Sequence, residues 1–252
     1  MFNVSDTSYD NFMGRYSVRL APVFADFAGI EAGQRVLDVG AGTGALTSEL
    51  VRRGAEAAAA DPSPSFVAAL ERRLPDVDVR AATAEELPWP DESFDAALAQ
   101  LVLTFMSDAP AGIEEMRRVV RPGGVVSTCM WDIEGMEMLA AVGRMQRVFP
   151  GDGATPERRT TYRSRETIEG LFVRDGFTDV RTELLEVHAE YSGFEEFWSA
   201  LSDGAGPAGV WMRSLGEEQR PDVRDEMYRQ LDSPVGAFGL TGRAWATRAT
   251  RA

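Results

Sequence analysis

The sequence contains no lysine. All 26 of its basic residues are arginine, and they face 40 acidic residues, which gives a formal net charge of −14. The absence excludes chemistry that needs a lysine amine: a phosphate-binding-loop lysine, a Schiff base and a lysine general base. The acidic balance also argues against nucleic acids and anionic membrane surfaces as partners, because both repel a negatively charged protein.

Cysteine and histidine are each present once. Cys129 has no partner for a disulfide within the chain or for a cysteine-rich zinc site, and its apolar surroundings predict a small buried side chain. A single histidine excludes metal sites that need two or more, and we expect no metal. His188 lies within a strand pattern, so it is either a structural residue or a candidate general base.

The sequence shows no targeting or membrane segment. Its first residues, MFNVSD, include an acid and form no apolar run. The most apolar stretch, residues 96–106, is interrupted by Gln100 and Thr104 and is too short to cross a bilayer. We therefore expect a cytoplasmic location.

Short apolar runs alternate with helix-period segments, which is the pattern of an α/β fold. Four crossovers join the first five predicted strands, and right-handed connections turn such strands into a parallel, doubly wound sheet. Two more strands follow in a looser second half. The predicted strands cover residues 35–40, 56–61, 77–83, 94–100, 125–131, 180–191 and 237–248.

The segments between these strands predict helices. Leu46, Leu50 and Val51 form the apolar stripe of one helix, and Asp108 caps another. Further helices are expected over 166–174 and about 217–231, with a Gly/Pro loop before the second. The sequence has no internal repeat, low-complexity tract or long linker. We expect a single domain over residues 1–252.

A glycine-rich loop follows the first predicted strand, in the order Asp38-Val39-Gly40-Ala41-Gly42-Thr43-Gly44-Ala45. Glycines at a strand-to-helix turn let the backbone approach a ligand, and the helix start offers unpaired N–H groups. Asp61 ends the next strand, where a carboxylate can accept hydrogen bonds from both ribose hydroxyls of an adenosine. The loop therefore predicts a site for an adenosine-containing cofactor.

Two cofactor classes fit this loop. Gly40-x-Gly42-x-x-Ala45 satisfies the loose dinucleotide pattern of nicotinamide enzymes, whereas Asp38-x-Gly40-x-Gly42-x-Gly44 satisfies the S-adenosylmethionine motif. A dinucleotide places an anionic pyrophosphate at this turn, which Asp38 would repel. S-adenosylmethionine has no phosphate and carries an ammonium and a sulfonium, so the acid favours it.

The chain resembles the class I S-adenosylmethionine-dependent methyltransferases, and among them the type 11 small-molecule group. The likeness is strong over about residues 9–132 and general in layout beyond. Its motifs stand in the family order: residues 36–44 (VLDVGAGTG), 61–63 (DPS), 84–95 (AEELPWPDESFD) and 118–124 (RVVRPGG). The resemblance implies a Rossmann-like fold with a seven-stranded, mostly parallel sheet. It also implies N-terminal lid helices (1–30), a cofactor-binding core (31–132) and an acceptor-side half with helical insertions (133–252).

The resemblance also implies the residues that contact S-adenosyl-L-methionine and its product S-adenosyl-L-homocysteine. The glycine loop would border the methionine and ribose portions, and the residues after the second strand would hold the ribose. Thr83 stands where the family commonly has an aspartate for the adenine amino group, so an uncharged hydroxyl replaces a carboxylate. The implied cofactor residues are Arg15, Asp38, Gly40, Ala41, Gly42, Thr43, Gly44, Asp61, Pro62, Ser63, Thr83, Ala84, Glu85, Gln100 and Leu101.

The N-terminal segment and several aromatic residues are candidates for the acceptor site. Arg15 would pair with the cofactor carboxylate, and Phe12 and Tyr16 would wall the acceptor, unless this segment is a plain amphipathic helix with Leu20, Phe24 and Phe27 inward. Phe105, Met106 and Trp131 follow strands, where α/β sheets bind ligands. Three later aromatics either close the pocket or pack in the core: Phe197, Trp198 and Trp211.

These patterns together predict a methyltransferase that acts on a small molecule by in-line displacement, with proximity and orientation as its main contribution. A nicotinamide-dependent oxidoreductase and a non-catalytic S-adenosylmethionine-binding protein are the alternatives. The net charge favours neutral or cationic acceptors, and we expect a monomer or homodimer without nucleic-acid or membrane partners. The carbon, nitrogen or oxygen atom that is methylated stays open.

Overall fold

The computed structural model describes residues 13–151, 161–173, 176–203 and 206–252. Their contacts fall into two compact units. The larger unit consists of residues 20–131, 158–185 and 244–252, and the smaller unit of residues 1–19, 132–157 and 186–243. The single-domain organisation over residues 1–252 stays a prediction.

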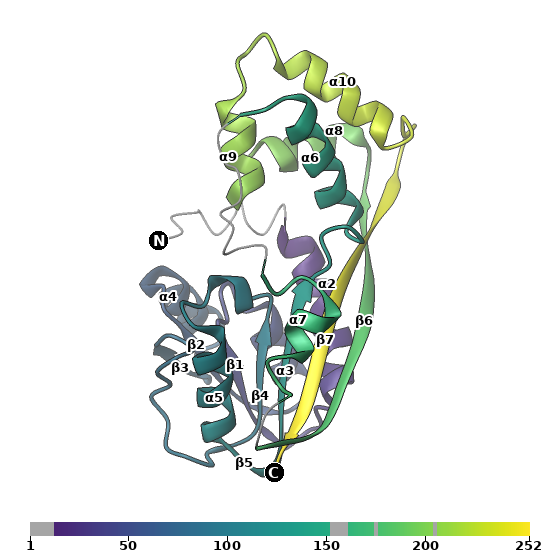
Figure 1. Ribbon diagram of the computed structural model, residues 1–252. Helices are drawn as coiled ribbons and strands as arrows, with labels where there is room; N and C mark the ends of the chain where they lie inside the picture. Colours follow the sequence, from purple (N-terminus) through teal and green to yellow (C-terminus); the bar gives the residue numbers. More distant parts are fainter. Residues whose placement is uncertain (1–12, 152–160, 174–175, 204–205) are drawn as a thin grey trace. The chain divides into compact units, whose positions relative to one another are not determined.

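A seven-stranded sheet in the order β3-β2-β1-β4-β5-β7-β6 organises the fold (Figure 1). The first five strands pair in parallel, and β7 pairs antiparallel to β5. The predicted doubly wound, mostly parallel sheet is thereby confirmed. Its strands are β1 (Arg35–Val39), β2 (Glu56–Asp61), β3 (Asp78–Ala81), β4 (Phe94–Gln100), β5 (Val120–Trp131), β6 (Phe177–Tyr191) and β7 (Phe238–Arg251).

Helices pack against the sheet strands of the larger unit. Small and aliphatic residues fill β1, β2 and β4, so the sheet is buried on both faces, as parallel sheets are. Helices α5 and α7 contribute to one buried cluster with β4 and β5. The helices with residues in this unit are α2 (Arg15–Ala28), α3 (Ala45–Arg52), α4 (Pro64–Arg73), the 3₁₀ turn η2 (Leu103–Phe105), α5 (Ala109–Val119) and α7 (Arg165–Glu169).

Some boundaries in the larger unit differ from the predicted ones. Strand β5 begins at Val120 rather than 125, and its pairing register with β4 shifts between Phe94 and Ala96. Gly124 permits this, because a side chain there would lie 2.5 Å from the carbonyl oxygen of Asp95. Helix α7 ends at Glu169, earlier than predicted. Val51 was expected in an inward stripe, but it is 40% exposed on α3, whereas Leu46 and Leu50 are buried.

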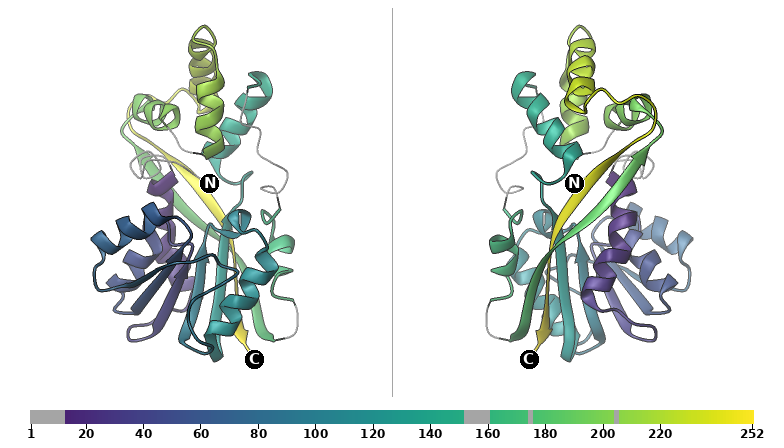
Figure 2. Two further views of the ribbon diagram at one scale, coloured as in Figure 1. Left: turned by 90° about the vertical axis from the view of Figure 1, so that its left-hand side faces the viewer. Right: turned by 90° about the vertical axis from the view of Figure 1, so that its right-hand side faces the viewer.

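The smaller unit is mainly helical, and residues of β6 and β7 belong to it as well (Figure 2). Helix α9 stands where the sequence predicts a Gly/Pro loop. Trp211 explains the helix: its ring is 1% exposed and its Nε1 donates a 2.9 Å hydrogen bond to the carbonyl of Phe149, so packing overrides weak local propensity. The helices are α6 (Glu137–Val148), α8 (Phe194–Ser202), α9 (Gly206–Ser214) and α10 (Arg220–Gln230).

Two further predictions concern burial and membrane insertion. Phe197 and Trp211 are each 1% exposed, so they pack in the core of the smaller unit, and Trp198 stacks on Phe194 at 6.3 Å between ring centroids.

In the part of the chain that the structure describes, no helix is both long enough and apolar enough to span a bilayer.

Candidate cofactor site

The glycine loop connects β1 to α3 in the larger unit. Gly40 has φ +73° and Gly42 has φ +54°, both in the left-handed region that favours glycine. A Cβ at Gly40 would lie 2.6 Å from the side chain of Val102, so this glycine permits close packing between the loop and the end of β4. A Cβ at Gly42 would meet nothing within 4 Å. The backbone at Gly42 thus borders open space.

Asp61 joins the end of β2 to this loop. One carboxylate oxygen accepts a 2.9 Å hydrogen bond from the Gly42 N–H, and the other accepts a 2.8 Å bond from the Ser63 N–H. The residue is 7% exposed, and its burial raises the pKa of the carboxyl. Each carboxylate oxygen has a second lone pair, so Asp61 can accept further hydrogen bonds from a ligand.

Asp38 is the second buried acid of the site. It is 1% exposed, and Oδ2 accepts a 2.6 Å hydrogen bond from the Thr47 hydroxyl of α3. Burial raises the pKa of Asp38 to about 7; the charge of Asp61 adds to this rise, and the Thr47 bond opposes it. Sequence reasoning missed Thr47. Its one signal is helical spacing, since it lies three residues before the buried Leu50 of α3.

The remaining predicted cofactor residues of the larger unit lie at or just after the ends of β3 and β4. Ala84 is buried and Thr83 is exposed. Glu85, expected beside an adenine, accepts hydrogen bonds from the N–H groups of Ser107 (2.6 Å) and Asp108 (3.0 Å) at the start of α5. Leu101 follows Gln100 with φ +65°, a strained conformation for a branched side chain, and its N–H donates a 2.9 Å bond to the Cys129 carbonyl.

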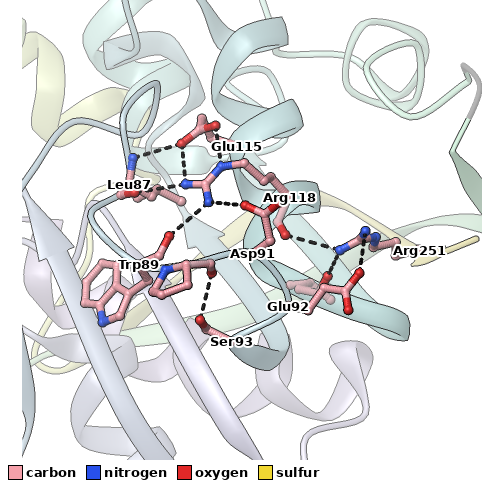
Figure 3. A network of polar contacts seen from close by, with 10 residues as sticks. Leu87, Trp89, Asp91, Glu92, Ser93, Glu115, Arg118 and Arg251 are labelled. Carbon is pink, nitrogen blue, oxygen red and sulfur yellow. Dashed lines mark hydrogen bonds and ion pairs between the residues drawn. The ribbon is translucent and has the colours of Figure 1, made fainter.

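A network around Arg118 holds the loop between β3 and β4 (Figure 3). The guanidinium bonds Glu115 and Asp91 at 2.8 Å and the carbonyls of Leu87 and Trp89 at 2.9 Å. Glu115 also accepts a 3.0 Å bond from the Leu87 N–H. Arg118 opens the motif RVVRPGG, and its place in the sequence gives no sign of these partners. The network fixes the loop that carries Ala84 and Glu85.

The predicted acceptor residues of the larger unit differ in exposure. Phe105 is 55% exposed, Met106 is partly buried, and Trp131 is 5% exposed at the end of β5. All three follow or end the strands β4 and β5. Phe105 therefore offers an accessible aromatic side chain on the segment that Glu85 holds.

Arg15 and Tyr16 belong to the smaller unit, and Phe12 lies outside the described residues. Arg15 forms a 2.7 Å ion pair with Glu196 and lies 4.2 Å above the Tyr191 ring. Tyr16 is fully buried, with its hydroxyl 3.2 Å from that of Tyr191, and burial raises the pKa of the Tyr16 phenol. The Ser192 N–H and Arg15 lower the pKa of Glu196 to about 2, so the ion pair is charged at neutral pH.

Of the remaining reactive candidates, one belongs to the smaller unit and the other is buried. His188 is 62% exposed in the smaller unit, with Nδ1 3.3 Å from the Thr241 hydroxyl and Nε2 3.5 Å from Glu186. Cys129 is fully buried, and burial raises the pKa of its thiol. Across the described ranges, no three His, Cys, Asp or Glu side chains are grouped so as to hold a metal ion.

A comparison with family models matches residues 37–128 to a methyltransferase domain. An uncharacterized methyltransferase of Mycobacterium tuberculosis is 39% identical over 130 residues, which is 52% of this chain and 52% of that relative. The demethylmenaquinone methyltransferase of Beutenbergia cavernae is 43% identical over 99 residues, or 39% of this chain and 41% of that relative. The match thus spans about half the length of such curated relatives.

Solved structures agree on the fold. A protein of Anaeromyxobacter dehalogenans with the provisional name of type II methyltransferase has a TM-score of 0.67 and 21% identity, over 92% of this chain and 95% of that one. The [4+2]-cyclase SpnF has a TM-score of 0.53 and 22% identity, over 93% and 81%. Family match, relatives and fold together identify a methyltransferase domain at residues 37–128 and support its assignment to the class I S-adenosylmethionine-dependent methyltransferases.

Proposed function

We propose that the chain binds S-adenosyl-L-methionine in the larger unit and transfers its methyl group to a small molecule. The observation that carries the proposal is the bond between the Asp61 carboxylate and the Gly42 N–H, beside a backbone that borders open space. The donor set fits the cofactor: Asp61 retains acceptor capacity for ribose hydroxyls. The Haemonchus contortus phosphoethanolamine N-methyltransferase 2, which shares the fold with a TM-score of 0.55, was crystallised with S-adenosyl-L-methionine.

The predicted residues of the larger unit contact different parts of the cofactor in this proposal. The backbone from Gly40 to Gly44, with Ala41 and Thr43, borders the methionine and ribose portions. Asp61, Pro62 and Ser63 hold the ribose, and Thr83 and Ala84 border the adenine. Gln100 and Leu101 meet the methionyl end. The bound cofactor supplies an electrophilic methyl group on a sulfonium. The chain itself binds, orients and excludes water, effects that together contribute roughly 7–11 kcal/mol to such a reaction.

The acceptor part of the proposal rests on Phe105, Met106 and Trp131. Phe105 is accessible for contact with an apolar acceptor, whereas the buried Trp131 supports the site from the end of β5. The pairing of Arg15 with a cofactor carboxylate stays a prediction that competes with its ion pair to Glu196. Tyr16 is left out of the acceptor wall, because its phenol is buried against Tyr191.

Calorimetry with S-adenosyl-L-methionine and S-adenosyl-L-homocysteine tests cofactor binding. We expect the wild type to bind both and Asp61→Ala to weaken binding about ten- to hundredfold, because one charged hydrogen-bond partner is lost. Asp76→Ala removes an exposed acid of the same unit and should leave the affinity unchanged. Tight NADH binding in place of S-adenosyl-L-methionine would favour the nicotinamide alternative.

Methyl transfer requires a second experiment, because fold alone does not fix the reaction. The relation in fold to a protein that is named as a cyclase illustrates this point. Transfer of labelled methyl groups to a broad panel of small acceptors should yield a methylated product. Cofactor binding with no product across the panel would favour a non-catalytic binding protein. We further propose that the chain has no nucleic-acid partner, supported by the net charge of −14. A monomer or homodimer and a cytoplasmic location stay proposals.

A further inference from the structure

Arg163 differs from the other partly buried arginines of the described residues. It lies just before α7 in the larger unit, its side chain is partly buried, and burial lowers the pKa of its guanidinium. Arg53 bonds Asp26 and Glu49, Arg118 bonds Glu115 and Asp91, and Arg248 bonds the Phe27 carbonyl. Within the described ranges, Arg163 alone among the partly buried arginines has no hydrogen bond or ion pair.

The backbone on both sides of Arg163 is held in place. Tyr162 packs against the buried cluster of the larger unit, as do Val102 and Met106 of the candidate site. Ser164 caps α7 in a capping box with Thr167, in which the Ser164 N–H donates a 3.2 Å bond to the Thr167 hydroxyl. The backbone that carries Arg163 is therefore held on both sides, so the lack of a partner among the described residues does not come from a loose chain end.

A partly desolvated cation without a partner is costly, and proteins normally pair such a group. This chain has 40 acidic residues, yet none of the described ones reaches Arg163. The guanidinium fork matches the planar oxygens of a carboxylate and the oxygens of a phosphate. The position is thus suited to an oxyanion that comes from outside the chain.

We propose that Arg163 binds a carboxylate or phosphate group of the methyl acceptor, an inference that rests on the proposed function. The packing beside Arg163 supports the acceptor as the source. Tyr162, next to Arg163 in the chain, packs against the same buried cluster as Met106, which is one of the predicted acceptor residues. Because the net charge of −14 repels anions overall, an anionic acceptor needs a local cation of this kind.

The first test titrates the protein with inorganic phosphate and, separately, with acetate at constant ionic strength, and follows the arginine Nε–H signals by NMR. The Arg163 signal is identified by its loss in Arg163→Gln and, should that variant misfold, in Arg163→Lys. We expect a saturable shift of this signal. Arg181→Gln is the matched control, since Arg181 is exposed on β6 in the same unit and has no hydrogen bond or ion pair among the described residues. An unchanged Arg163 signal, or equal shifts at all arginines, would overturn the proposal.

The second test separates the acceptor from the cofactor as the source of the anion. We expect Arg163→Gln to bind S-adenosyl-L-homocysteine as the wild type does, and to lose about ten- to hundredfold in kcat/KM for an anionic acceptor found in the methylation panel. A loss of S-adenosyl-L-homocysteine affinity of that size, with phosphate competing, would assign the anion to the cofactor carboxylate and overturn the acceptor assignment. A wild type that shifts with phosphate but binds neither cofactor form would instead contradict the proposed function and leave the oxyanion site standing.

Discussion

At the scale of single residues, the site contains two acids whose pKa values are both raised by burial. Asp38 and Asp61 both have raised pKa values, and only Asp61 is bonded by two backbone N–H groups. Asp38 accepts a bond from the Thr47 hydroxyl, and the Thr47 backbone N–H also favours its charged form. A carboxyl that titrates near neutral pH in the glycine loop makes folding and cofactor binding depend on pH.

The first prediction concerns Asp38→Asn, which keeps an oxygen for the Thr47 hydroxyl and removes the charge. The folded pKa of about 7 exceeds the ordinary 3.8, so folded Asp38 holds a proton that the unfolded chain has released between these values. Wild-type stability therefore falls as pH rises through this window. The variant should gain little near pH 4 and on the order of 4 kcal/mol above pH 7. Urea denaturation at several pH values measures this, and equal stabilities at pH 8 would contradict it.

The second prediction compares two glycines of the loop. Gly40→Ala places a Cβ against the stiff side chain of Val102 at positive φ, which should cost about 2–4 kcal/mol of unfolding free energy. Gly42→Ala meets no neighbour, so its cost in stability should stay near 1–2 kcal/mol. Its methyl group, however, occupies the space proposed for the cofactor. Thermal unfolding and calorimetry should thus show Gly40→Ala as mainly a stability variant and Gly42→Ala as mainly an affinity variant.

Residues whose role depends on local sequence could be predicted, and those whose role depends on tertiary contacts could not. The glycine loop and Asp61 follow from strand, turn and spacing. The positive φ of Leu101, the bond between Thr47 and Asp38 and, among the described residues, the lack of a partner at Arg163 depend on how separate elements pack. Glu85 shows the same limit, because the sequence places it near the site but gives no sign that it bonds the start of α5.

At the scale of elements, the order and type of the sheet strands were predictable, and their ends were less so. Strands β2 and β4 begin and end where the apolar pattern predicts, because both are short and buried. The start of β5 depends on Gly124 fitting against β4, and α9 depends on the burial of Trp211. Local preference indicates turns in both segments, and long-range packing overrides it.

The third prediction concerns the loop between β3 and β4. Arg118→Met keeps the apolar stem and removes the guanidinium, which leaves the carbonyls of Leu87 and Trp89 without this donor. We expect a loss of about 2–3 kcal/mol in unfolding free energy and faster hydrogen exchange over residues 84–91. The adjacent Arg117→Met is the control, since among the described residues Arg117 pairs only with Glu114 along the same helix. Similar losses in both variants would show that the loop does not depend on Arg118.

At the scale of the whole molecule, the family domain covers residues 37–128, which all belong to the larger unit. The fold of this part follows closely from the sequence pattern. The smaller unit has helices that the pattern describes only in part, and its aromatic residues pack with one another instead of forming a predictable motif. This explains why the sequence indicates the cofactor class and leaves the acceptor open.

The boundary between the two units has a consequence for how the chain can be divided. It passes through α2 after Arg19, through β6 after Leu185 and through β7 after Arg243. Domains that are exchanged as modules are usually joined at exposed linkers, where few contacts cross. Here a cut at any of these three places would end a helix or strand partway along its hydrogen-bond pattern. Neither unit can be excised with one or two cuts between elements, so recombination would transfer the two units as one piece.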